Sequence, residues 1–143
     1  MKRILTCRWL AAVLVASGGC QLAMASATAL PAAQHAGPVT FVSGGVGLDE
    51  SRALKEAMHN YPLVLEFAGR TSDGNKYLAD VPVRIFDANG KAMLETSARG
   101  PFLLVSLPVG RYTVAASYGE KTEQRSVNVL PNGHVHQLFL WQM

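Results

Sequence analysis

Two histidines separated by one residue, His134 and His136, are the side chains in this sequence best suited to bind a metal ion. Alternate residues of a β-strand project to the same face, so the two imidazoles would lie close enough to share a copper or zinc ion. A metal site needs three or four ligands, and no pattern in the sequence places His35 or His59 beside this pair. The pair therefore favours two solvated histidines on the outer face of the last strand, with a metal-binding pair as the alternative.

A glycine-rich run, Gly44-Gly45-Val46-Gly47, precedes a predicted helix and is the second feature that could bind a ligand. Backbone N–H groups at the start of a helix bind phosphate readily. However, no Lys-Ser or Lys-Thr pair follows the run, and Asp49 and Glu50 place negative charge where a phosphate would lie. We interpret the run as a flexible turn between a strand and the helix.

Groups suited to catalysis give little signal. No serine lies in the nucleophile-elbow pattern. Glu66 and Arg84 occupy outward positions of predicted strands, where charged side chains usually pair across strands in solvent. We expect a protein without enzymatic activity and without a cofactor.

The composition excludes some classes of partner. The chain has 143 residues, with 13 Lys and Arg against 10 Asp and Glu, and Lys2, Arg3 and Arg8 account for the whole surplus. The neutral remainder argues against binding to nucleic acid, which needs an excess of basic side chains. A hydrophobic fraction of 49% with 16% charged residues predicts a packed core, and the length predicts one domain.

The N-terminal residues predict export. A basic start, a short apolar run over residues 9–16 and small residues around position 25 predict a secretory signal peptide at residues 1–25, cleaved between Ala25 and Ser26, with cleavage after Ala27 as the alternative. The apolar run is shorter than the roughly 20 residues that span a bilayer, and no later stretch approaches that length. We expect a periplasmic or secreted protein without a transmembrane segment. Lipidation of Cys20, which would anchor the chain, is the alternative.

One helix and several short strands are predicted after a flexible lead-in at residues 26–37. Apolar residues recur at helical spacing within residues 49–60, and Tyr61 precedes a proline, so the helix should stop by about Asn60. The stripe consists of Ala53, Leu54, Ala57, Met58 and Tyr61. Alternating apolar residues predict strands at 39–42, 63–68, 81–86, 91–96, 102–107, 111–118, 122–130 and 134–141, with a polar loop at 69–75.

The turn signals, which recur about every eight to twelve residues, predict a mainly β fold in residues 38–143: an antiparallel sandwich of about seven strands with one N-terminal amphipathic helix. Pro82 cannot donate to a strand ladder, which favours a strand that lies at a sheet edge or begins near this residue. Phe86 should point outward if its neighbours point inward, as should Leu138 and Leu140. We expect the helix and the N-terminal strand to cover these outward apolar residues, because an amphipathic helix buries its apolar stripe.

Four segments of the β portion form a recognisable set: Ala79-Asp80-Val81-Pro82-Val83, Asp87-Ala88-Asn89-Gly90, Gly100-Pro101-Phe102-Leu103-Leu104 and Leu107-Pro108-Val109-Gly110-Arg111-Tyr112. Together they resemble the carboxypeptidase regulatory-like domain, a member of the transthyretin-like (prealbumin-like) superfamily. The run from Phe41-Val42-Ser43-Gly44-Gly45 through the predicted helix also looks similar to small exported bacterial proteins of this group with no assigned activity. The resemblance to the domain covers roughly residues 77–129. It implies a transthyretin-like β-sandwich, and it does not imply catalysis.

The most specific part of the resemblance is Leu107-Pro108-x-Gly110-x-Tyr112, which joins Gly100 as the structural signature. Pro108 and Gly110 set a tight turn, and the Tyr112 hydroxyl is predicted to bond to the backbone at this corner.

The predicted function is a non-catalytic, exported interaction or structural module. Edge strands carry unpaired N–H and C=O groups, so we expect a protein or another component of the envelope or cell surface to bind at an edge strand or at a loop surface. The alternative is a small metal-handling protein centred on His134 and His136.

Overall fold

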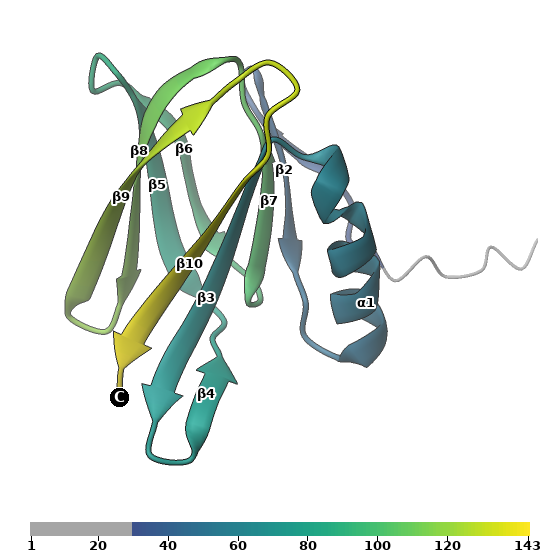
Figure 1. Ribbon diagram of the computed structural model, residues 1–143, viewed down its shortest axis with the longest axis vertical. Coiled ribbons are helices and arrows are strands. Elements are labelled where there is room, and N and C mark those ends of the chain that lie inside the picture. Colours follow the sequence, from purple (N-terminus) through teal and green to yellow (C-terminus); the bar gives the residue numbers. More distant parts are fainter. Residues whose placement is uncertain (1–29) are drawn as a thin grey trace, which may run out of the picture.

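The computed structural model describes residues 30–143, which form two β-sheets that face each other, with a helix on the outside (Figure 1). The predicted signal peptide, the cleavage site between Ala25 and Ser26, and Cys20 lie outside the described residues, as does the start of the predicted lead-in. Within residues 30–143, no helix has the length and apolar character needed to cross a bilayer.

The larger sheet has six strands and the smaller sheet has four, counted over the described residues. The larger sheet has the order β1, β2, β7, β3, β10, with β4 paired to β3 outside this path, and the smaller sheet has the order β6, β5, β8, β9. The strands are β1 (Gln34–Ala36), β2 (Val39–Gly44), β3 (Leu63–Thr71), β4 (Gly74–Tyr77), β5 (Val81–Asp87), β6 (Ala92–Ala98), β7 (Phe102–Ser106), β8 (Gly110–Tyr118), β9 (Lys121–Val129) and β10 (Val135–Gln142).

The core fills the space between the two sheets, and the alternation in the sequence explains it. Val83 and Ile85 on β5 and Val114 on β8 are at most 1% exposed, while the residues between them face outward. Phe67 on β3 and Trp141 on β10 stack at one side of the core, with ring centroids 6.3 Å apart. Because successive side chains of a strand point to opposite faces, the alternating apolar residues lie on the inner faces of both sheets, as the sequence pattern predicted.

The last strand departs from the predicted antiparallel arrangement. β10 runs parallel to β3, with Val135 opposite Leu63 and Gln142 opposite Arg70. Every other strand pair among residues 30–143 is antiparallel. A parallel pair requires the chain to cross from one end of the sheet to the other, and here the segment between β3 and β10 makes that crossing by building the second sheet.

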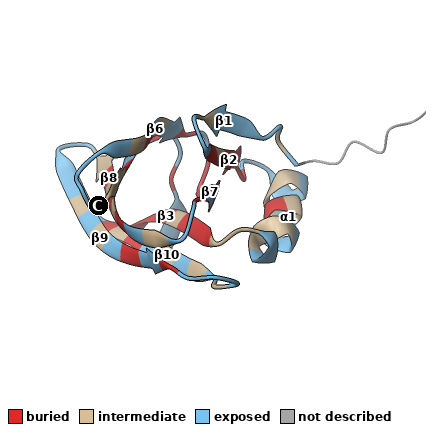
Figure 2. Ribbon diagram, turned by 90° about the horizontal axis from the view of Figure 1, so that it is seen from above, coloured by how far each residue is buried: buried red, intermediate tan, exposed pale blue. Residues whose placement is uncertain are grey.

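Helix α1 (Leu48–Ala57) continues into a short 3-10 turn, η1 (Met58–Asn60), and both match the predicted helix closely. Tyr61 is extended, with φ −117° and ψ 136°, as a residue before proline prefers. Leu54 is fully buried on the outer face of the larger sheet, where it packs with Val42, Val64 and Leu104. In Figure 2, α1 lies beside β2 and β7, and part of its ribbon has the colour of buried residues. The apolar stripe therefore anchors the helix to β2, β3 and β7.

The face that α1 covers differs from the predicted one. Phe86 points outward from β5, which belongs to the smaller sheet, so the helix on the larger sheet does not reach it. Leu138 also stays uncovered, with 43% of its surface exposed. The helix instead covers Val64 of β3, which points to the outer face of the larger sheet.

Two further predictions are wrong in detail. β1 lies within the predicted lead-in and pairs with β2. The predicted polar loop at residues 69–75 contains the end of β3 and the start of β4, joined by a tight turn in which Thr71 Oγ1 donates to the carbonyl of Gly74 at 2.8 Å. Of the two positions that Pro82 allowed, the structure shows the second: β5 pairs with both β6 and β8 and is an interior strand, but it begins at Val81, next to Pro82, and its pairing with β8 begins only at Val83.

Candidate functional site

His134 and His136 bond to different partners. His136 Nε2 lies 2.9 Å from Glu66 Oε2, and His134 Nδ1 lies 3.0 Å from the carbonyl oxygen of Tyr61. Because carbonyl and carboxylate oxygens accept hydrogen bonds, each of these ring nitrogens carries a proton. His134 also precedes β10, so only His136 follows the geometry of that strand.

The other histidines do not complete a site around this pair. His35 lies on β1, with its Nδ1 3.1 Å from Oγ1 of Thr40 on β2, and His59 lies on η1. Within residues 30–143, no three side chains of His, Cys, Asp or Glu come together in a way that could hold a metal ion. A metal bound at His136 Nε2 would have to displace Glu66, and metal binding at this pair stays a prediction.

The glycine-rich run forms the turn between β2 and α1. Gly45 and Gly47 have φ angles of 107° and 94°, which side-chain-bearing residues rarely adopt. The Gly45 N–H donates to Glu50 Oε1 at 2.8 Å, so the carboxylate of this chain occupies the position that a bound phosphate would need. The interpretation of the run as a strand-to-helix turn is consistent with this contact.

The predicted corner is present at Tyr112. Its hydroxyl donates to the carbonyl of Pro108 at 2.6 Å, which fixes the turn between β7 and β8. Burial, with a smaller contribution from the nearby Asp87 carboxylate, raises the pKa of Tyr112 above its usual value of 10.0. The hydroxyl is therefore held in its protonated, hydrogen-bonding form.

Gly100 has a steric role at the other end of β7. A Cβ atom at this position would run into the backbone carbonyl of Gly44. Next to it, the Arg99 N–H donates to the buried Ser43 Oγ at 2.6 Å, which ties the turn after β6 to β2. The signature residues Gly100 and Tyr112 thus hold two opposite ends of the fold.

Three turns near Tyr112 enclose a depression that we call the loop hollow, with a volume of about 480 Å³. It is lined by residues 59–62 after the helix, by Leu107 and Val109 between β7 and β8, and by residues 129–134 between β9 and β10. Val109 and Leu130 lie on this surface with 61% and 55% of their area exposed. The sequence placed His59 and His134 far apart, and the fold brings both to this hollow.

The turns around the loop hollow are held by hydrogen bonds. Val135 N–H donates to the carbonyl of Pro62 and Gly133 N–H to that of Leu130, both at 2.9 Å. The contacts from His134 to Tyr61 and from Tyr112 to Pro108 add to these bonds. The exposed apolar side chains of the loop hollow are therefore presented by a fixed backbone.

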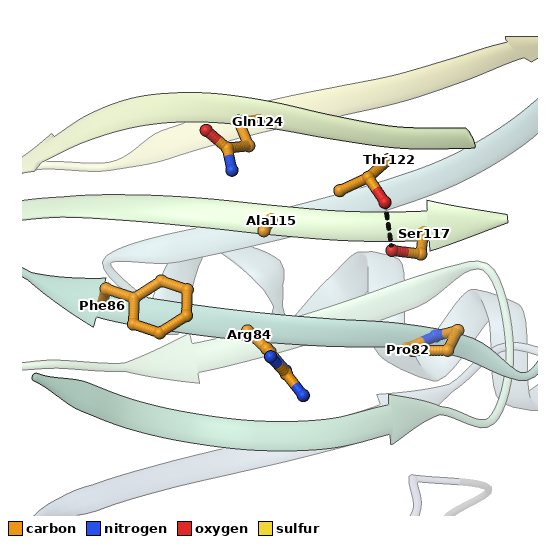
Figure 3. A pocket seen from close by; sticks show the side chains of 7 residues that line it. All are labelled: Pro82, Arg84, Phe86, Ala115, Ser117, Thr122 and Gln124. Atoms are coloured by element: carbon orange, nitrogen blue, oxygen red, sulfur yellow. Dashed lines mark hydrogen bonds between the residues drawn. The ribbon is translucent and has the colours of Figure 1, made fainter. Parts of the chain in front are cut away.

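A second depression, the sheet hollow, lies on the outer face of the smaller sheet and has a volume of about 400 Å³ (Figure 3). Three neighbouring strands line it. Pro82, Arg84 and Phe86 come from β5, Ala115 and Ser117 from β8, and Thr122 and Gln124 from β9. Helix α1 contacts only the larger sheet, so no helix of the described residues covers this face.

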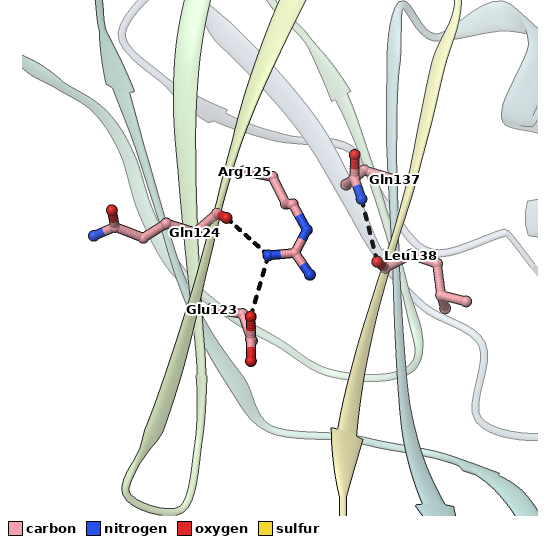
Figure 4. Close-up of polar contacts among 5 residues, drawn as sticks. All are labelled: Glu123, Gln124, Arg125, Gln137 and Leu138. Carbon is pink, nitrogen blue, oxygen red and sulfur yellow. Dashed lines mark hydrogen bonds and ion pairs between the residues drawn. The ribbon is translucent and has the colours of Figure 1, made fainter.

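The two longest edge strands, β9 and β10, are shielded by their own side chains (Figure 4). Arg125 Nη1 donates to the carbonyl of Gln124 at 2.8 Å and pairs with Glu123 at 3.1 Å, while Gln137 Nε2 donates to the carbonyl of Leu138 at 3.3 Å. The Arg125 guanidinium also lies 5.6 Å from the ring centroid of Phe139 on β10. Such charged, self-bonded edges discourage strand addition.

No family model matches the chain, and no curated protein matches it.

Proposed function

We propose that the protein is a non-catalytic, exported interaction module that binds a protein of the envelope or cell surface through the loop hollow. The observation that carries the proposal is the exposure of Val109 and Leu130 on turns that are fixed by hydrogen bonds. Apolar side chains presented by rigid loops favour docking, because little conformational entropy is lost on binding.

The loop hollow supports the proposal better than the edge strands do. Arg125 occupies a backbone carbonyl of β9 and Gln137 one of β10, so a strand added to either edge would have to displace the side chain that is bonded there. Nothing comparable occupies the loop hollow, whose titratable lining residues are His59, Tyr61 and His134, without a carboxylate, lysine or arginine. We therefore expect the partner to insert an apolar side chain there rather than a charged one.

Two further parts of the proposal concern the fold family and the location. We propose a transthyretin-like arrangement of the two sheets, supported by the resemblance of residues 77–129 to carboxypeptidase regulatory-like domains and by the Tyr112 corner. We propose export on the basis of the basic and apolar N-terminal pattern.

Photo-crosslinking in intact cells tests the loop hollow. A photoreactive amino acid at Val109 should give a discrete adduct with a partner protein, and the adduct should disappear when Leu130→Asp is added. The control places the same amino acid at Glu120, which is exposed in the turn between β8 and β9. Equal adducts from both positions, or an adduct that survives Leu130→Asp, would contradict the proposal.

Intact-mass spectrometry tests export and metal content together. Protein purified from the periplasm or medium should begin at Ser26 and carry no lipid, and its mass should not change when copper or zinc is added. A mass that includes residues 1–25 would remove the signal-peptide prediction, and a lipid on Cys20 would favour anchoring. A stoichiometric metal that is lost in His136→Ala would favour the metal-handling alternative.

A further inference from the structure

The sheet hollow is created by a small side chain in the middle of a row. The register places Arg84 of β5, Ala115 of β8 and Gln124 of β9 side by side across three strands. The Ala115 methyl group forms a low floor between two long side chains. The volume of about 400 Å³ falls within the range of about 300–1,000 Å³ that is typical of ligand sites.

The backbone of the sheet hollow is not available to a ligand. β5 pairs with β6 and β8, and β8 pairs with β5 and β9, so the main-chain N–H and C=O groups of these two strands belong to ladders. β9 is an edge strand, and Arg125 occupies its carbonyl at Gln124. A peptide cannot add here as an extra strand. Recognition must come from side chains alone.

These side chains suit a neutral ligand. Arg84 is the only charged residue that lines the sheet hollow, and its Nε lies 3.7 Å from Glu95 Oε1 on the neighbouring strand. The remaining polar groups are the hydroxyls of Ser117 and Thr122, which are 2.8 Å apart, and the amide of Gln124. Hydroxyl and amide groups both donate and accept hydrogen bonds, as do the hydroxyl groups of a sugar.

Phe86 supplies the apolar part of the sheet hollow. It is half-buried and points outward beside a bulge, where the register of β5 and β6 shifts between Ile85 and Phe86. In Figure 3 its ring borders the space above Ala115 and Arg84. A pyranose ring presents C–H groups on its faces and hydroxyl groups around its rim, so it can contact an aromatic ring and a polar rim at once.

We propose that the sheet hollow binds a neutral oligosaccharide, with one sugar ring over Ala115 and against Phe86. Beyond the hollow, the same outer face carries three uncharged polar side chains that would contact neighbouring sugars: Thr113, Ser126 and Asn128. Arg111 lies opposite Asn128 at the far end of this face, away from the hollow. The site shares no residue with the loop hollow, so it stands or falls independently of the protein partner proposed there.

Amide NMR of the ¹⁵N-labelled protein, titrated with neutral oligosaccharides, tests the proposal. The probes are oligomers of α-1,4-glucose, β-1,4-glucose and β-1,4-N-acetylglucosamine, with oligogalacturonate as the charged counterpart. We expect at least one neutral oligomer to bind saturably by about 10 mM and to shift amide signals of β5, β8 and β9. Oligogalacturonate should bind more weakly.

Two variants locate the site. Phe86→Leu removes the aromatic ring, and Ala115→Leu fills the floor, and each should weaken binding by about tenfold or more. Tyr77→Leu, at an aromatic residue that is 57% exposed on the larger sheet, is the matched control and should bind as the wild type does. Gln124→Ala, on the exposed edge strand, replaces Ala115→Leu if that variant does not fold.

Several results would overturn the proposal. These are the absence of saturable binding for all three neutral oligomers, unchanged affinity in Phe86→Leu, preferential binding of oligogalacturonate, or amide shifts confined to the loop hollow.

Discussion

Replacing Tyr112 by phenylalanine removes one hydroxyl from a buried corner and leaves the packing of the ring in place. The hydroxyl donates to the carbonyl of Pro108 at 2.6 Å, and the side chain is only 5% exposed. The carbonyl that loses its partner lies on an exposed turn, where water can replace the hydroxyl. The loss should therefore be that of one net hydrogen bond, about 1 kcal/mol of the free energy of unfolding.

For a domain of this size, a loss of about 1 kcal/mol lowers the melting temperature by about 4 °C. Urea unfolding followed by circular dichroism measures the free energy directly. Tyr118→Phe is the matched control, because Tyr118 also contacts the core through its ring, with 6.0 Å between its centroid and that of Trp141, while its hydroxyl makes no hydrogen bond within residues 30–143. It should change stability by less than about 0.5 kcal/mol.

The difference between wild type and Tyr112→Phe should also depend on pH. Since the pKa of Tyr112 is raised in the folded state above its usual value of 10.0, the protonated hydroxyl stabilises the fold fully below pH 10. That contribution is lost as the pH rises above 10 toward the folded-state pKa, so the gap between the two proteins should narrow there. A variant as stable as wild type at pH 7, or a gap that widens above pH 10, would refute the role assigned to this corner.

Three other substitutions, one of them with a matched control, test the packing. Gly100→Ala should lower the free energy of unfolding by about 2 kcal/mol because its Cβ meets the Gly44 carbonyl. Gly110→Ala should be nearly neutral in the same urea titration: Gly110 has no positive φ and its added Cβ lies 3.6 Å from the nearest atom, so the turn does not require the glycine that the sequence pattern suggested. Leu54→Ala should lower the free energy of unfolding by about 3 kcal/mol, because it leaves a cavity between α1 and the larger sheet. A loss below about 1 kcal/mol would show that this residue does not anchor α1. Trp141→Phe should lower the free energy of unfolding by no more than about 1 kcal/mol, because the small cavity it leaves is offset by the removal of a buried Nε1–H that has no partner among residues 30–143. A loss above about 3 kcal/mol would contradict this balance.

Local patterns in the sequence were sufficient to predict many elements of this fold. The alternation in β5 and β8, the helix that ends before Pro62 and the Tyr112 corner depend on neighbouring residues, so the sequence predicts them well. β1 and β4 were missed because Gln34–Ala36 and Gly74–Tyr77 lack apolar alternation. They are strands only because a long partner strand lies beside each.

Contacts between distant segments were beyond the reach of local patterns. Nothing near His136 indicates that Glu66 would face it, because that contact follows from the parallel pairing of β3 and β10. The sheet hollow likewise depends on which strands are neighbours: the outward position of Phe86 was predicted, but the approach of Ala115 and Gln124 requires the order of the smaller sheet.

The parallel partnership of β3 and β10 has a consequence for the folding rate. β3 is an interior strand of the larger sheet only when β10 is present, and the whole smaller sheet lies between the two in the chain. Closing such a long loop costs conformational entropy, and this cost slows folding. Folds dominated by pairings between segments far apart in the sequence reach the native state in milliseconds to seconds. Until β10 docks, the edge of β3 is open to other chains, so refolding yield should fall with rising protein concentration.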